Sequence, residues 1–216
     1  MKTLKQLKYS EAGFRAFYHH FVLVPLNDRL RKTAAFFPGV DKADYVITYG
    51  YIDHTAGMTM EILAAAIKEG DRFLLGNTNL KVASKIRIGA IMNEECYGMD
   101  DEENRSLYGK YAVCVDRLAD YDAGEEVEEC RKMTFLDECR SPEYPDDVLV
   151  YLVKDGNHLE GCWVRIEGIV ERHLQGTLLN EPDQDFGCHE GDLIEFSVNQ
   201  MEDGQIVLCA DRESGY

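Results

Sequence analysis

The stretch Ser141-Pro-Glu-Tyr-Pro-Asp-Asp147 marks the point at which the pattern of the sequence changes. It holds two of the five prolines of the chain, and segments of this composition are typical of domain boundaries. Every segment after it has the pattern of a short strand, whereas the residues before it mix helical and strand patterns. The sequence therefore predicts an α+β protein, with a mixed α/β domain over residues 1–143 and a smaller domain over residues 146–212.

The smaller domain is expected to be a β-barrel-like antiparallel domain. Its segments are short, alternate between apolar and polar residues, and are separated by turn-forming residues such as Asp155-Gly-Asn157. The predicted strands are Val148–Lys154, Cys162–Val170, Leu174–Leu179, Asp192–Val198 and Gln205–Ala210.

The larger domain is expected to contain both helices and strands. Asp44–Ile52 alternates as a strand, and Lys110–Arg117 is a second predicted strand. Thr59–Glu69 is rich in Met, Leu, Ile and Ala and is followed by Gly70, which predicts a helix with a glycine after its C-terminus. Asn93–Asn104 is acidic and without an apolar period, which favours a surface loop.

Charge is distributed unevenly along the 216 residues, whose formal net charge is −17. Residues 1–90 carry a net charge of +5 and residues 91–216 a net charge of −22. The acidic part would repel nucleic acid, because binding to phosphates depends on Lys and Arg. Three explanations of the acidic excess are open: solubility, a basic protein partner, or hard cations.

The seven cysteines are odd in number and form no Cys-x-x-Cys pair, so buried free thiols are expected. The histidines show no metal-ligand spacing, and neither a metal nor a cofactor is predicted. The longest apolar runs are six residues, so no membrane span is expected. The first eight residues lack the apolar stretch of a signal peptide, which predicts a cytoplasmic protein.

Three residues of the larger domain are candidates for binding a ligand. Alternation places Tyr49 and Tyr51 on one face of the strand Asp44–Ile52, where they would line a pocket or form an aromatic ladder. His54 follows in a loop between this strand and the next element, a location that suits function. Its partner, if it has one, would come from elsewhere in the fold.

Trp163, the single tryptophan, is the first candidate in the smaller domain. It shares one face of its strand with Arg165 and Glu167, whereas Val164 and Ile166 face the core. A large aromatic residue on a half-polar face suits interdomain packing, a secondary cluster or a binding surface. Polar candidates for binding a ligand or partner in the long loop that follows are Asn180, Asp183 and Asp185.

Residues 148–210 carry three short motifs, which are Trp163-Val164, Gly176-Thr-Leu-Leu-Asn-Glu-Pro182 and Gly191-Asp192. In these motifs the segment resembles a bacterial family described as a domain of unknown function. The chain has Cys209-Ala-Asp211 where that family carries an Asp-Trp-like ending. The resemblance implies a small β-rich module and brings no activity and no catalytic residues.

Two functions remain as hypotheses. The first is a non-enzymatic intracellular interaction module, for example an acidic immunity-type protein that masks a basic partner. The second is an enzyme or small-ligand-binding protein with a site between the two domains.

Overall fold

The structure is a computed structural model that describes residues 4–70 and 72–211. The chain is α+β and forms two compact units, residues 1–122 and residues 123–216.

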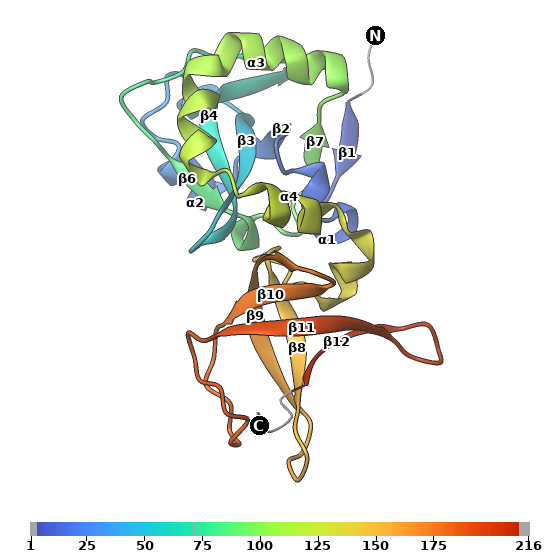
Figure 1. Cartoon of the computed structure of the whole chain (residues 1–216). Helices are drawn as coiled ribbons and strands as arrows, with labels where there is room; N and C mark the ends of the chain where they lie inside the picture. The colour runs from blue at the N-terminus through green and yellow to red at the C-terminus, as the bar shows by residue number, and fades with distance from the viewer. Residues whose placement is uncertain (1–3, 71, 212–216) are drawn as a thin grey trace. The chain divides into compact units, whose positions relative to one another are not determined.

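The first unit contains an antiparallel sheet with helices packed on it (Figure 1). Its strands are β1 (Lys5–Leu7), β2 (Phe21–Pro25), β3 (Tyr45–Asp53), β4 (Gly57–Glu69), β5 (Arg72–Leu75), β6 (Lys85–Arg87) and β7 (Cys96–Gly98). Its α-helices are α1 (Tyr9–Ala12), α2 (Asp28–Thr33) and α3 (Asp101–Val115). Its 3-10 helices are η1 (Phe14–Ala16), η2 (Val40–Lys42), η3 (Ile88–Ala90) and η4 (Asp116–Tyr121).

The sheet has the strand order β1-β7-β2-β3-β4-β5, and β6 pairs separately with β4. Both of its faces are covered. One face packs against α1, α2 and the 3-10 helices η1 to η3, through residues such as Phe17 and Phe37. The other face packs against α3, which runs across it and contributes Tyr111 and Cys114 (Figure 1).

The prediction of a helix over Thr59–Glu69 is wrong, because these residues form strand β4. Residues 57–66 are buried without interruption, since β4 lies inside the sheet and contacts a core on each face. A strand buried on both faces shows no alternation, and its apolar run resembles that of a buried helix. Pairing with three neighbouring strands overrides the helical propensity of Met, Leu and Ala.

The predictions of a loop over Asn93–Asn104 and of a strand over Lys110–Arg117 are also wrong, since β7 and α3 occupy most of these residues. Helix α3 begins with a capping box, in which Asp100 accepts hydrogen bonds from the backbone of Glu102 and Glu103, and the Glu103 carboxylate accepts one in return. This spacing is a helix start signal that the acidic composition concealed.

The second unit is a five-stranded closed barrel. Its strands are β8 (Asp147–Val153), β9 (Glu160–Val170), β10 (His173–Leu178), β11 (Leu193–Gln200) and β12 (Ile206–Asp211). Each predicted strand is present. Neighbours along the chain pair antiparallel, whereas β12 and β8 close the barrel as a parallel pair. The closing pair is parallel because five alternating strands leave the first and the last pointing the same way.

Two helices precede the barrel strands and pack onto them: α4 (Glu125–Lys132) and η5 (Thr134–Cys139). Cys130 and Leu136 extend from these helices into the barrel core. The stretch Ser141–Asp147, at which the sequence analysis placed the domain boundary, therefore lies inside the second unit. The units divide between Asp122 and Ala123.

Candidate functional site

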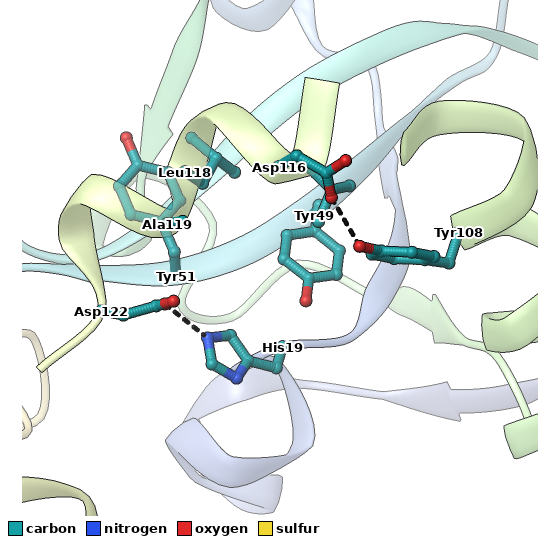
Figure 2. A pocket seen from close by; sticks show the side chains of 9 residues that line it. His19, Tyr49, Tyr51, Tyr108, Asp116, Leu118, Ala119 and Asp122 are labelled. Atoms are coloured by element: carbon teal, nitrogen blue, oxygen red, sulfur yellow. Dashed lines mark hydrogen bonds and ion pairs between the residues drawn. The ribbon is translucent and has the colours of Figure 1, made fainter. Parts of the chain in front are cut away.

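The first unit contains a cavity of about 170 Å³ on the α3 side of the sheet, below η4 (Figure 2). Three tyrosines, a histidine and two aspartates supply its polar and aromatic lining. They are His19, Tyr49, Tyr51, Tyr108, Asp116 and Asp122. Val115, Leu118 and Ala119 complete the lining with apolar groups.

Strand β3 places two of the tyrosines on this side of the sheet. Tyr49 and Tyr51 are two residues apart, so the strand period directs both side chains to one face. Tyr49 is half-buried, whereas Tyr51 is 2% exposed. Both tyrosines line the cavity, which is one of the two alternatives that the sequence left open for them.

His19 reaches the cavity because the turn before β2 crosses directly over Gly50 of β3. The His19 N–H donates to the Gly50 carbonyl at 2.9 Å, and the Gly50 N–H donates to the His20 carbonyl at 3.1 Å. A Cβ atom at Gly50 would overlap the carbonyl oxygen of Phe17, so only glycine permits this approach. His19 itself has φ 57°, a left-handed conformation that costs energy and needs surrounding contacts to hold it.

We expect Gly50→Ala to lower the free energy of unfolding by about 1–3 kcal/mol, because backbone and core must move to admit the methyl group. It should also displace His19 from the cavity. Urea denaturation and the NMR signals of the His19 ring would measure the two effects. Gly109→Ala is the matched control, since nothing lies within 4 Å of a Cβ placed there. Equal behaviour of the two variants would contradict this account of Gly50.

The polar groups that line the cavity give it a negative charge. The His19 Nε2 atom lies 3.5 Å from the Asp122 carboxylate, and the Tyr108 hydroxyl donates to Asp116 at 2.5 Å (Figure 2). Burial, and then the charge of Asp122, raises the pKa of Tyr49 to about 12. The phenols are therefore neutral at physiological pH, and two carboxylates dominate the charge of the lining.

A buried polar cluster lies on the same face of the sheet, behind Tyr51. Glu61 of β4 is 4% exposed and stands opposite Tyr49 in the strand register. Its Oε2 atom has no hydrogen-bond partner among the described residues. Lys85 donates to the Tyr121 hydroxyl at 2.9 Å and lies over the rings of Tyr51 and Tyr121. Burial raises the pKa of Glu61 to about 7, although the charge of Lys85 opposes the shift.

The sequence analysis found part of this site. His54, its third candidate, is exposed in the turn between β3 and β4 and does not line the cavity. His19, Tyr108, Asp116 and Asp122 were missed. The capping box of α3 could have suggested Tyr108 and Asp116. It predicts a helix that begins at residue 101, and two residues eight positions apart lie on roughly the same face of a helix. No local signal marks His19.

In the second unit Trp163 lies on the outer face of the barrel and is 40% exposed. Leu149 stands opposite it on β8. Arg165, on the same face, forms a bidentate ion pair with Asp147 at 2.7 and 2.9 Å. This hydrogen bonding raises the pKa of Arg165, which is therefore held as a structural cation. Of these two candidates, Trp163 is the one whose side chain is exposed and available to a partner.

The polar candidates of the long loop have structural contacts. Asn180 accepts a hydrogen bond from the Trp163 N–H at 2.8 Å, so it fixes the loop to β9. The backbone of Asp183 donates to Glu160, and the backbone carbonyl of Asp185 accepts from Lys154. The side chain of Asp183 is exposed, whereas that of Asp185 also accepts a hydrogen bond from the Gly187 N–H.

Gly176 behaves as its position in the sequence motif suggests. A bulge interrupts the β9–β10 pairing at this residue, and a Cβ there would overlap the Arg165 carbonyl oxygen. Its role is to permit close strand packing.

The seven cysteines are thiols that form no disulfide bond with one another, and burial raises the pKa of the thiols of Cys96 and Cys130 to about 12 and about 11. Over residues 4–70 and 72–211 no group of three or more His, Cys, Asp or Glu residues has metal-binding geometry. Within the same ranges, none of the helices has the length and apolar character needed to span a membrane. Comparison with protein-family models, curated proteins and solved structures finds no match to the chain.

Proposed function

We propose that the protein is a non-catalytic binding protein whose second unit recognises a basic protein partner. The observation that carries this proposal is the charge of the barrel surface. Residues 123–216 contain 23 acidic and 7 basic residues. Among the described residues of this unit, eighteen acidic side chains are exposed, against two exposed basic side chains, Lys132 and Arg172.

The remaining arginines of the described barrel unit do not neutralise this surface. Arg131 and Arg140 are 4% and 8% exposed, and both hold backbone or carboxylate groups inside the unit. Arg165 is occupied by Asp147. The acidic excess of the unit therefore lies on its surface. Solubility of a small domain needs a net charge of only about 2–8 in magnitude, so this excess favours a second purpose.

Apolar groups on the outer face of the barrel supply anchors within this acidic surface. Trp163 and Leu193 are 40% and 55% exposed. Glu195, two residues after Leu193 on β11, places a carboxylate on the same face. Tryptophan is enriched at protein interfaces and among the residues that contribute most of the binding energy. A basic partner would match the charge, whereas nucleic acid would be repelled.

The test is the salt dependence of association. The tagged protein is purified from cells of its own source, and each captured protein is then produced separately and its on-rate measured at low and high salt. We expect a basic partner whose on-rate falls at least about tenfold, because salt screens exposed charges. A partner whose on-rate is flat with salt would overturn the proposal.

Charge reversal locates the surface. Asp183→Lys with Glu195→Lys should slow association, since both side chains are exposed on the surface of the barrel unit. Asp41→Lys with Glu69→Lys is the matched control, because it changes the net charge equally at exposed positions of the first unit. Equal slowing by both pairs would mean that recognition does not use the barrel surface.

A further inference from the structure

We propose that the cavity beside Tyr49 is a binding site for a small organic cation carrying a protonated amine or a guanidinium group. The proposal concerns the first unit alone and does not depend on the basic partner of the second. The cation would lie against the ring of Tyr49, among the other residues that line the cavity (Figure 2).

The charges of the lining favour a ligand with a positive charge. Asp116 and Asp122 carry the negative charge, and no lysine or arginine lines the cavity. His19 is the one lining residue that can become positive, and it lies beside Asp122. A bound anion would face two carboxylates, whereas a cation would be attracted to both.

The aromatic walls suit the same ligand. The faces of tyrosine rings attract cations within about 6 Å of the ring centre. The protein already uses this interaction next to the cavity, where Lys85 Nζ lies 5.5 Å from the ring centre of Tyr51 and 4.7 Å from that of Tyr121. Tyr49 and Tyr108 contribute two further tyrosine rings to the lining of the cavity (Figure 2).

The cavity also offers hydrogen-bond acceptors that the described chain leaves unused. The Tyr49 hydroxyl makes no hydrogen bond with another described residue, and Asp116 receives one from Tyr108 at Oδ1 alone. N–H groups of an ammonium or guanidinium ion would donate to these oxygens.

The size of the cavity limits the ligand to a small group. A volume of about 170 Å³ lies below the roughly 300–1,000 Å³ of pockets for drug-sized molecules. It suits the end of a lysine or arginine side chain or a free alkylamine. Both aspartates are partly in solvent, so we expect a dissociation constant of about 1 mM, or roughly −4 kcal/mol, for such a fragment.

The experiment titrates the full-length protein with matched fragments and follows the NMR signals of its tyrosine rings. n-Butylammonium and butylguanidinium should bind and shift the Tyr49 signals. n-Butanol and butyrate have the same apolar chain without the positive charge and should bind at least about tenfold more weakly. Equal binding of butanol would overturn the proposal, and so would the absence of any Tyr49 shift with either cation at 50 mM.

Variants separate recognition from general charge. Asp122→Asn and Asp116→Asn should each weaken butylammonium binding about three- to tenfold. The matched control is Asp120→Asn, which removes the same charge from an exposed residue of η4 that lies between the two aspartates in sequence and outside the lining. Melting temperature and circular dichroism check that each variant is folded. If Asp120→Asn weakens binding as much as the other two, the cavity is not the site.

A last comparison distinguishes the two sources of the cation. Nα-acetyl-lysine methylamide presents the lysine side chain with its peptide backbone attached. Binding equal to that of butylammonium identifies a site that accepts side chains of a protein, whereas binding of butylammonium alone identifies a site for free amines. Failure of both would contradict the proposal, while leaving the salt-dependent partner of the barrel unit unaffected.

Discussion

Replacing Arg131 by alanine should lower the free energy of unfolding of the second unit by about 3–5 kcal/mol, because it leaves a buried carboxylate without its counter-charge. Arg131 donates to Asp146 at 2.9 and 2.6 Å, and to Glu128 at 2.6 Å. Asp146 is 6% exposed and cannot be stabilised by water when the guanidinium is removed. Urea denaturation followed by the fluorescence of Trp163, the single tryptophan, measures this unit specifically.

Lys132→Ala is the control for this prediction. Lys132 is the next residue and pairs with Glu129, but its side chain is 69% exposed. Exposed ion pairs contribute about 0–1 kcal/mol, so a small change is expected. The double variant Arg131→Met with Asp146→Leu should recover much of the loss, because it removes both charges together. If Arg131→Ala and Lys132→Ala have equal effects, the buried pair does not stabilise the unit.

Ionisation of Glu61 should make the stability of the first unit fall as pH rises. The pKa of this carboxyl is about 7 in the folded protein, against an ordinary value of 4.5. Its neutral form is favoured by folding, so the stabilisation is fully present below pH 4.5 and is lost as pH rises through about 7. The shift corresponds to about 3 kcal/mol.

The measurement compares urea unfolding of the wild type and of Glu61→Gln at pH 5 and pH 8, followed by circular dichroism. The glutamine variant cannot ionise at this position, so the difference between the two proteins should change by about 3 kcal/mol in favour of the variant at pH 8. Glu69→Gln, on the exposed end of the same strand, should leave the pH dependence unchanged. Parallel pH profiles for wild type and Glu61→Gln would show that Glu61 does not titrate in this range.

The barrel was predictable because the sequence of each strand alternates between residues that are buried and residues that are exposed. In β9 the residues Cys162, Val164 and Ile166 are buried, whereas Trp163 and Glu167 between and after them are exposed. A strand with one buried face must alternate, and alternation is visible in a single sequence. The same rule placed Tyr49 and Tyr51 on one face of β3, and these are two of the three tyrosines that line the cavity.

The strand conformation of β4 depends on tertiary structure. So does the meeting of the remaining residues that line the cavity. β4 is buried on both faces, and its run of Met, Leu, Ile and Ala carries no period from which a strand could be recognised. His19 and Asp122 meet although they lie in segments far apart in the sequence, because the turn Phe17–His20 crosses Gly50 and η4 follows α3 across the sheet. Local periodicity reports how one segment is buried, whereas the approach of two distant segments depends on every contact between them.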